Sequence, residues 1–517
     1  MNINNASTTL NALLSALPIF WLIAGLGFFR LAAWKVCLAG LFLSLALAAS
    51  FHLMPVSLAL MAAADGAAFA LAPILWVVLA AFFSYNITTR TGAADEIKKL
   101  LSGLSDDRRI QALIIAWGFG SFMEGVAGFG TAVAVPAALL ISMGFEPFKA
   151  AMICLLANTI AVPFGVIGLP VSTLVKVTEM PMAEVTLAII KQLSHFVVLT
   201  PFLIVTTTGG ALGALKGVWL PTLAAGVSFG LTQAAVVIFI GPELPAILSS
   251  MVSVLSIIIC LKLRPPRHLW RFADDEPLRT GQGTPITVNA QLKAWSPYLL
   301  LLFMALMSSP LFPKFRAVLD LVSTSITIYD QPGAKPHEVL WLTTPGSLVF
   351  LSAIIGGLIQ KASPAMMLRL LLTTAKQLKY TALTIISIVA MAKVLGYSGM
   401  IMSVATAVAG AAGSFYPLCA PFLGALGTFL TGSDTSSAIL FGPLQKAVAL
   451  RTAVDPAWIV AANSSGACIG KLISPQSMAI AAMAAGLTGR EGAMLSAALR
   501  YALPLLAAAG LYIWLMA

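Results

Sequence analysis

Charged residues are scarce in this chain of 517 residues, and only 9% are Asp, Glu, Lys or Arg. A soluble domain carries about 25% charged residues, so the composition excludes an ordinary soluble fold. Histidine and cysteine are also rare, with four and five copies, and the cysteines show no paired spacing. These counts favour neither a disulfide framework nor a metal site. We therefore expect no metal and no cofactor.

Two motifs of enzyme chemistry are missing as well. The sequence contains no His-Glu-x-x-His and no Cys-x-x-Cys, which are the spacings of zinc-dependent hydrolysis and of thiol redox chemistry. We therefore do not expect an enzyme, and a membrane-embedded enzyme stays only as an alternative.

Hydrophobic residues, in contrast, make up 59% of the chain, and long apolar runs recur from residue 10 to 517. About 20 apolar residues suffice for one helix to cross a bilayer. The sequence therefore predicts an all-α polytopic membrane protein with about 12 to 14 transmembrane segments. The net charge is +11, and most basic residues flank apolar runs, as the positive-inside rule requires. This charge indicates membrane topology and lipid contact, not binding of nucleic acid.

The distribution of charge and proline divides the chain into five parts. These are 1–110, N-terminal spans with an amphipathic helix within 93–110; 111–262, a first transport repeat with spans; 263–293, a cytoplasmic loop; 294–414, spans with an external loop at 310–345; and 415–517, a second transport repeat with the last span.

The two transport repeats are apolar stretches that are broken by polar and helix-disrupting residues on the same plan. In residues 416–485, Gly432-Ser433-Asp434-Thr435 takes the place that Gly128-Phe129-Gly130-Thr131 has in residues 111–180. Asn463 likewise corresponds to Asn158, and each asparagine is followed by a glycine after seven residues and a proline after twelve. Interrupted segments in corresponding positions of two halves point to the binding site of a transporter. We hypothesise that the halves are inverted and contain broken helices or re-entrant hairpins.

The residues at these breaks suit an organic anion and a proton. A broken helix exposes N–H groups at the start of the next helix, and such a terminus favours an anion. Asn, Ser and Thr side chains add hydrogen bonds for a carboxylate and a hydroxyl, and Lys471 or Lys393 adds positive charge. Glu124 and Asp434 are carboxylates within apolar segments, where ionisable groups often relay protons.

Each of these residues also has a structural interpretation. Glu124 would accept hydrogen bonds from backbone N–H groups, and Asp434 would cap a helix or pair with Lys471. The asparagines would satisfy free carbonyls, and the glycines would permit close helix packing. Asp65 would lie near a helix end or beside Ser or Thr, and Lys393 would extend toward the membrane surface.

Four motifs occur in order along the chain: Glu-Gly-x-Ala-Gly-Phe-Gly from Glu124, Ala-Asn-Thr from Ala157, Thr-Gly-Ser-Asp-Thr-Ser-Ser from Thr431, and Gly-Lys-x-Ile-Ser-Pro-Gln-Ser from Gly470. With these motifs the chain resembles the bacterial L-lactate permease family, which includes glycolate permeases. The similarity is strongest in Ala70–Gly92, Phe119–Pro170, Tyr397–Met400 and Gly424–Gly486.

The resemblance implies a multi-pass symporter of the bacterial inner membrane that carries protons with short 2-hydroxy monocarboxylates, namely L-lactate, D-lactate and glycolate. The matching motif positions include Gly125 and Pro475. The candidate proton-coupling residues are Glu124 and Asp434. The candidate substrate-binding residues are Gly128, Phe129, Gly130, Thr131, Asn158, Thr159, Ser433, Thr435, Asn463, Ser464, Lys471, Ser474 and Gln476.

Two departures from the family pattern leave the exact substrate open. Ala132 follows Thr131 where the family often has proline, and Pro163 is displaced from the usual Asn-Thr-Ala-Pro order. The alternatives are a carrier for another small organic anion, such as glycolate alone or a dicarboxylate, and an anion channel. The sequence does not give the proton stoichiometry or the oligomeric state.

Overall fold

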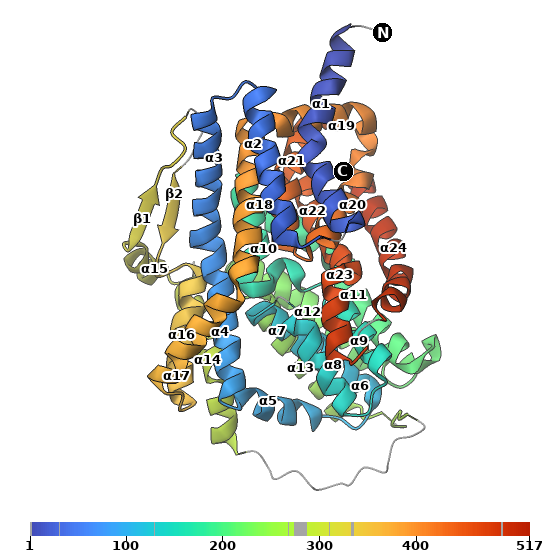
Figure 1. Ribbon diagram of the computed structural model, residues 1–517. Coiled ribbons are helices and arrows are strands. Elements are labelled where there is room, and N and C mark those ends of the chain that lie inside the picture. Colours follow the sequence, from blue (N-terminus) through green and yellow to red (C-terminus); the bar gives the residue numbers. More distant parts are fainter. Residues whose placement is uncertain are drawn as a thin grey trace.

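The computed structural model of the protein describes residues 3–29, 31–128, 130–266, 268–272, 287–309, 311–331, 336–487 and 490–517. These residues are almost entirely helical (Figure 1). The described residues contain nine helices that are long and apolar enough to cross a membrane, or eleven if each of two bent helix pairs is one span. Three shorter apolar helices complete the set. The structure confirms the predicted all-α polytopic membrane protein.

The N-terminal part is a set of spans followed by a short charged helix. Its elements are α1 (Ile3–Leu22), η1 (Ile23–Phe28), α2 (Ala33–Ser50), α3 (Val56–Phe69), η2 (Ala70–Leu75), α4 (Trp76–Arg90) and α5 (Ala93–Ser102). The helix α5 falls within the segment predicted to be amphipathic. Asp95 and Glu96 lie in its first turn and Lys99 in its last, which complements the helix dipole.

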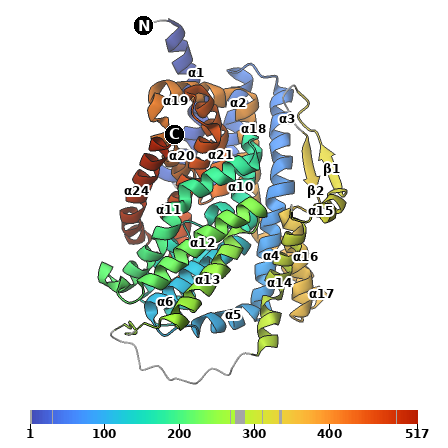
Figure 2. The same cartoon turned by 180° about the vertical axis from the view of Figure 1, so that it is seen from behind.

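The first broken stretch and the spans after it come next. They comprise α6 (Arg108–Ala112), η3 (Leu113–Phe119), α7 (Gly120–Val126), α8 (Thr131–Ser142), α9 (Pro147–Ala157), η4 (Val162–Phe164), α10 (Gly165–Thr178), α11 (Met182–Gly209), η5 (Leu212–Leu215), α12 (Trp219–Phe239) and α13 (Pro245–Leu263). Figure 2 shows α11, α12 and α13 packed together on the flank of the molecule. Residues 273–286 of the predicted cytoplasmic loop lie outside the described residues.

The rest of the chain contains the second broken stretch. Its elements are α14 (Val288–Met307), α15 (Pro313–Asp320), β1 (Ser323–Ile326), β2 (His337–Leu340), α16 (Pro345–Ile359), α17 (Pro364–Gln377), α18 (Lys379–Tyr397), α19 (Met400–Ala412), η6 (Gly413–Phe415), α20 (Tyr416–Thr431), α21 (Asp434–Thr452), α22 (Pro456–Ile473), α23 (Pro475–Ala484) and α24 (Glu491–Leu515). The antiparallel pair β1–β2 pairs Ser323 with Leu340. This small sheet lies in the loop at 310–345, for which the sequence predicted no strand.

Each broken stretch begins with a helical hairpin. In the first, the chain turns at Gly128 and Gly130, which both have positive φ, and α8 packs back on α7 and η3. In the second, α21 returns along α20, where the Ser437 hydroxyl donates to the Gly424 carbonyl at 2.8 Å. Figure 1 shows the first hairpin in the lower part of the molecule and the second in the upper part. The two hairpins therefore lie in different parts of the molecule, and the inversion of the halves stays a prediction.

A bent helix pair follows each hairpin. The pair α9–η4–α10 is bent by 70°, and the pair α22–α23 by 43°. The first pair breaks at residues 158–161, directly after α9 ends at its C-cap Asn158, and residues 166–168 are non-helical as well. The second pair breaks at Ser474, which is extended before Pro475. Proline disfavours the helical conformation in the residue before it. Asn463 was predicted at a break, but it lies inside the continuous helix α22, because proline and not asparagine sets the break there.

Candidate functional site

A buried ion pair joins the two broken stretches at the centre of the molecule. The ammonium nitrogen of Lys471, on α22, lies 2.7 Å from Oε1 of Glu124, on α7. The two residues are only 9% and 2% exposed. The structure therefore brings together two residues that the sequence placed in separate repeats. Oε1 of Glu124 therefore accepts a hydrogen bond from a lysine, whereas the structural interpretation expected backbone N–H donors.

Glycine makes room for the Glu124 carboxylate. A side-chain carbon added at Gly165 would lie 2.8 Å from Glu124 Oε1. Gly165 begins α10, and the next two residues, Val166 and Ile167, adopt φ values of 45° and 55°. Such left-handed conformations are rare for β-branched residues and mark strained backbone, which often accompanies functional sites. The hairpin turn at Gly128 in turn packs against Val166. The break in α10 and the tip of the first hairpin therefore form one wall around Glu124.

Asp434 is the second carboxylate of the centre. It is 3% exposed and accepts a hydrogen bond of 3.1 Å from the Ser464 hydroxyl through Oδ2. Ser433, and not Asp434, caps α21, since its hydroxyl accepts from the Ser436 N–H at 3.3 Å. Asp434 thus lies in the first helical turn with its side chain turned to α22, and the charges of Lys471 and Glu124 both act on it.

Several buried side-chain oxygens of the two broken stretches have no hydrogen-bond partner among the described residues. They are Oε2 of Glu124, Oδ1 of Asp434, Oδ1 of Asn158 and Oδ1 of Asn463. Buried polar atoms are nearly always hydrogen-bonded in proteins, so unmatched acceptors indicate that a donor is brought by a ligand or by water.

Other predicted residues mainly shape the backbone. The hydroxyls of Thr131 and Thr159 donate to the carbonyls of Gly128 and Leu156 at 2.7 and 2.8 Å. The Ser474 hydroxyl caps α23 by accepting from the Ser477 N–H at 3.1 Å. These hydroxyls stabilise the turns at the breaks, and their part in binding stays a prediction.

The remaining predicted positions differ in their surroundings. Gly130 begins α8 with φ of +90° and packs against Ile480 of α23. Thr435 is buried in the first turn of α21. Gln476 is exposed, and its side chain packs against Gly432 at the tip of the second hairpin. Phe129 lies outside the described residues.

A second charged cluster was not predicted as a unit. Lys393 of α18 lies 3.2 Å from Asp65 of α3 and donates to the Tyr397 hydroxyl at 3.1 Å. Tyr397 in turn donates to Asp65 at 3.2 Å, and its ring stacks on Tyr329. Lys393 therefore binds a buried carboxylate instead of extending to the membrane surface. The contact of Lys393 with Tyr397 follows from their spacing of four residues on one helix. No signal in the sequence predicts the contact of either residue with Asp65.

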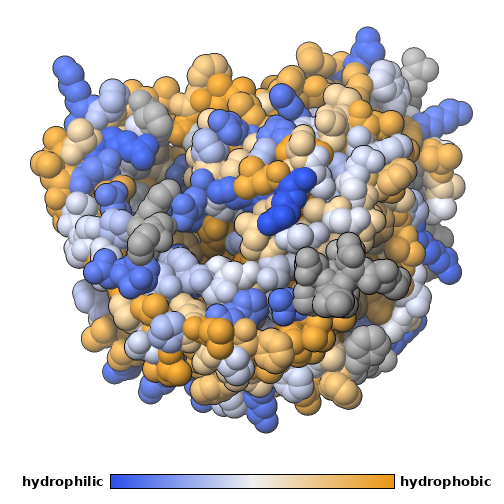
Figure 3. All heavy atoms as spheres, turned by 90° about the horizontal axis from the view of Figure 1, so that it is seen from above, coloured by the Kyte–Doolittle hydropathy of each residue, from blue (hydrophilic) through white to orange (hydrophobic). Residues whose placement is uncertain are grey.

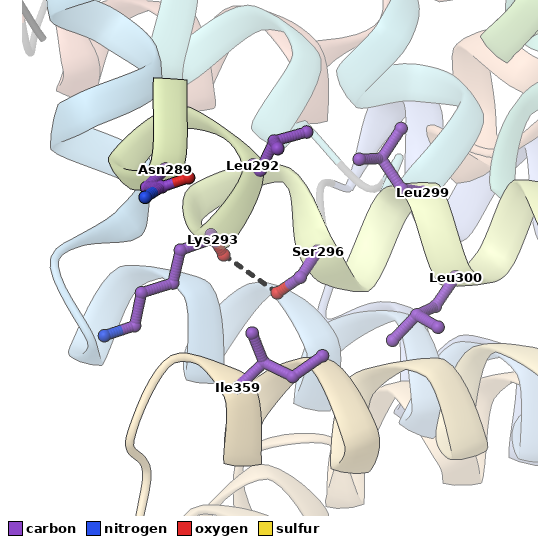
Figure 4. A pocket seen from close by; sticks show the side chains of 7 residues that line it. All are labelled: Asn289, Leu292, Lys293, Ser296, Leu299, Leu300 and Ile359. Carbon is purple, nitrogen blue, oxygen red and sulfur yellow. Dashed lines mark hydrogen bonds between the residues drawn. The ribbon is translucent and has the colours of Figure 1, made fainter. Parts of the chain in front are cut away.

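A shallow groove on the outer flank is a different kind of feature. It has a volume of about 470 Å³ and lies between α14 and α16, with leucines and Ile359 along its walls (Figure 4). Its polar residues are Asn289, Lys293 and Ser296, and the Ser296 hydroxyl is already bonded to the Lys293 carbonyl at 2.8 Å. The groove holds none of the predicted site residues, so we do not assign the transport site to it.

One motif of hydrolytic enzymes does occur in the sequence. Gly226-Val227-Ser228-Phe229-Gly230 fits Gly-x-Ser-x-Gly, but the segment lies inside the continuous helix α12. A nucleophilic serine of this type needs a sharp turn from strand to helix. Ser228 instead shares a 2.9 Å hydrogen bond with Ser256 on α13. The motif therefore stabilises the packing of two helices.

Comparison with known proteins places these features in a family. A sequence profile described as L-lactate permease matches residues 11–517. An L-lactate permease of Streptococcus iniae is 40% identical over 88% of this chain and 94% of its own length. An L-lactate permease of Bacillus subtilis strain 168 is 37% identical over 96% of this chain and 94% of its own length. The glycolate permease GlcA of Escherichia coli K12 is 35% identical over 96% of this chain and 93% of its own length.

Proposed function

Because this chain belongs to the L-lactate permease family, we propose that it is a proton-coupled symporter of short 2-hydroxy monocarboxylates across the bacterial inner membrane. The chain is a multi-pass membrane transporter and not an enzyme. The substrates we propose are L-lactate, D-lactate and glycolate, since relatives over nearly its whole length are named for lactate and for glycolate.

The observation that carries the proposal is the buried bond between Lys471 and Glu124. A carboxylate substrate is an alternative partner for Lys471, because it offers the same charge and the same oxygens as Glu124. Once displaced, Glu124 would be a buried carboxylate without a cation, which is costly. Uptake of a proton by Glu124 removes that cost. The charge of the site is then the same with and without cargo, so one proton and one monocarboxylate enter together.

The unmatched oxygens suit the rest of the substrate. A 2-hydroxyl group can donate to the side-chain oxygen of Asn158 or Asn463, both of which are buried without a partner among the described residues. Satisfying a buried acceptor discriminates strongly against analogues that lack the hydroxyl. Asp434 is the second candidate for the proton, since it lies at the same centre and its Oδ1 is also unmatched.

The test is uptake of radiolabelled L-lactate into proteoliposomes, with and without an inward proton gradient. Wild type is compared with Glu124→Gln, Asp434→Asn and the control Glu184→Gln, which alters an exposed carboxylate at the start of α11. We expect gradient-driven accumulation by wild type and by the control. Glu124→Gln should lose accumulation but keep exchange of internal for external lactate, because exchange needs no net proton movement.

The other outcomes decide between the alternatives. Loss of accumulation only in Asp434→Asn would move the proton to Asp434, and equal accumulation by all variants would exclude both carboxylates. Uptake by wild type that never exceeds the external concentration, with or without the gradient, would indicate an anion channel. Transport of glycolate alone, or of a dicarboxylate in place of lactate, would keep the fold and overturn the substrate.

A further inference from the structure

A large cavity lies beside the central site and is distinct from it. It has a volume of about 650 Å³ and is enclosed by the ends of α3 and α4 with η2, by α10, by α18 and by the segment from α15 to the start of α16. None of the candidate substrate-binding or proton-coupling residues of the two breaks lines it, but Lys393, which the sequence offered as a positive charge for the anion, does. Seen from above, the molecule is hollowed, and hydrophilic side chains border the hollow (Figure 3).

One face of α10 connects this cavity to the centre. Leu169, Ser172, Thr173 and Lys176 line the cavity, and their spacing of three, four and seven residues places them on one helix face. Leu169 directly follows the left-handed turn at residues 166–168, and the start of the same helix, Gly165, contacts Glu124. The residues of α10 that line the cavity therefore begin four positions after Gly165, which contacts Glu124.

Lys176, Arg316 and Lys393 line the cavity, and of these Lys393 has its nitrogen fixed by two bonds, to Asp65 and to Tyr397. An ammonium group has three N–H donors, and Lys393 uses two of them, for Asp65 and for Tyr397. Its side chain lines the cavity and is 25% exposed. The third N–H is therefore available to a carboxylate in the cavity, while Asp65 and Tyr397 fix the position of the nitrogen.

The rest of the lining fits one small hydroxylated monocarboxylate. Phe69 and Ile74 provide an apolar wall for a methyl group, and Ser172 and Thr173 provide hydroxyls. Glu243 and Glu338 also line the cavity. Glu179, Lys176 and Arg316 line it too, so the lining has three carboxylates and three cations with Lys393 included.

We propose that this cavity is an access site, in which Lys393 binds the carboxylate of a short 2-hydroxy monocarboxylate before the substrate reaches Lys471. The proposal rests on the proposed function, because it takes its ligand from it. It adds a second binding site on the pathway, with a cation on α18 that contacts neither Glu124 nor Lys471.

The first test is the kinetics of L-lactate uptake. Lys393→Gln alone would leave Asp65 without its cation, so the main variant is Lys393→Gln with Asp65→Asn. We expect the KM for L-lactate to rise about tenfold, the effect of losing one charge-assisted hydrogen bond. Lys393→Arg, which keeps the charge, and Lys379→Gln, which removes a lysine from the start of the same helix, should stay close to wild type.

The second test reports on the cavity directly. Ser172→Cys is labelled with a negatively charged methanethiosulfonate in a background where Cys260 and Cys419, the two cysteines that are not buried, are alanine. L-Lactate should slow the labelling, and lactamide, which has no charge, should not. The slowing of the labelling by L-lactate should persist in the Glu124→Gln variant. It should disappear in the double variant that combines Lys393→Gln with Asp65→Asn.

The outcomes separate this proposal from the proposed function. An unchanged KM in the paired variant, or slowing by L-lactate that survives it, would overturn the access site while lactate transport stands. Slowing that disappears with Glu124→Gln would also overturn it, since the ligand would then be at the centre. A wild type that carries no lactate would overturn the proposed function, whatever the labelling shows.

Discussion

Lys471 and Glu124 are separated by 347 positions in the chain, and yet they form a hydrogen bond of 2.7 Å in the core. Glu124 belongs to the helix that leads into the first hairpin, and Lys471 to the last turn of α22 before the second break. The pair therefore connects the two repeats at the place where their broken segments meet. Its strength should be visible in stability as well as in transport.

Removing one partner of this pair should destabilise the protein more than removing both. Lys471→Met leaves a buried carboxylate alone, and breaking a buried ion pair in this way costs about 3–5 kcal/mol. The double variant Lys471→Met with Glu124→Gln should recover most of that loss, since no charge is then left unpaired. Thermal unfolding of the purified protein in detergent checks this. A double variant less stable than Lys471→Met would refute it.

The side-chain oxygen of Asn158 should contribute to recognition of the 2-hydroxyl group. We expect wild type to take up L-lactate in strong preference to propionate, which lacks the hydroxyl. Asn158→Leu should reduce that preference about tenfold, the typical value of one hydrogen bond. Competition of unlabelled propionate against labelled L-lactate measures the ratio, and Asn463→Leu tests the equivalent position. An unchanged ratio in both variants would place the hydroxyl elsewhere.

Glycine at position 466 should be required for the packing of α20 on α22. A side-chain carbon there would overlap the carbonyl group of Pro421, so Gly466→Ala should yield little folded protein. Gly410 is the matched control, because it also lies within a helix but has open space around it. Gly410→Ala should stabilise the protein by about 0.5–1 kcal/mol. Size-exclusion profiles and melting temperatures of the two variants give the comparison.

Arg109 should be needed as an arginine. Its guanidinium bonds both carboxylate oxygens of Asp107, at 2.6 and 3.0 Å, and the carbonyls of Ala214 and Lys216. Lysine cannot reproduce this planar set of donors, so Arg109→Lys should cost about 1–3 kcal/mol. Arg316→Lys, in an exposed ion pair with Asp320, should cost below about 1 kcal/mol. Equal melting temperatures for the two variants would contradict the prediction.

Glu243 should make stability depend on pH. It lies in the loop between α12 and α13, where burial raises the pKa of its carboxyl, and the nearby charges of Arg316 and Lys176 only partly oppose this. A raised pKa means that the folded state holds the proton more tightly. The resulting stabilisation is complete below the unfolded pKa of about 4.3 and is lost as the pH rises through the folded value.

The measurement for Glu243 is the melting temperature as a function of pH. Glu243→Gln should stay neutral at every pH, so its advantage over wild type should grow from about pH 4 upward and then level off. Glu184→Gln, at an exposed position, gives the baseline for this substitution. A constant difference between Glu243→Gln and wild type across this range would show that the group is not perturbed.

Much of the architecture could be predicted from the pattern of apolar runs and breaks. Glycines 128, 130 and 432 mark the hairpin tips because their positive φ suits no other residue well. The matching spacing of Asn158 with Pro170 and of Asn463 with Pro475 identified the two bent pairs, although the first pair breaks at Asn158 and the second directly before Pro475. Asn463 showed the limit of this reasoning, because an asparagine does not by itself interrupt a helix.

The pairing of charges could not be predicted, because it depends on helices far apart in the chain. The sequence motif placed Lys471 in the site, but the positions of the residues along the chain do not predict its contact with Glu124. They do not predict the separate cluster of Lys393, Asp65 and Tyr397 either. The strands β1 and β2 were missed because each has only four residues. The roles assigned to the individual site residues stay predictions that the variants above would test.

The close contact of α20 with α22 has a mechanical consequence. Gly424 and Gly470, like Gly466, bring the two helix backbones together with no side chain between them, and such an interface cannot slide without steric overlap. The second hairpin and α22 should therefore move as one rigid body. The hinge of the carrier would then be the left-handed turn in α10, and a pair of spectroscopic probes on either side of that turn would record the change in distance during transport.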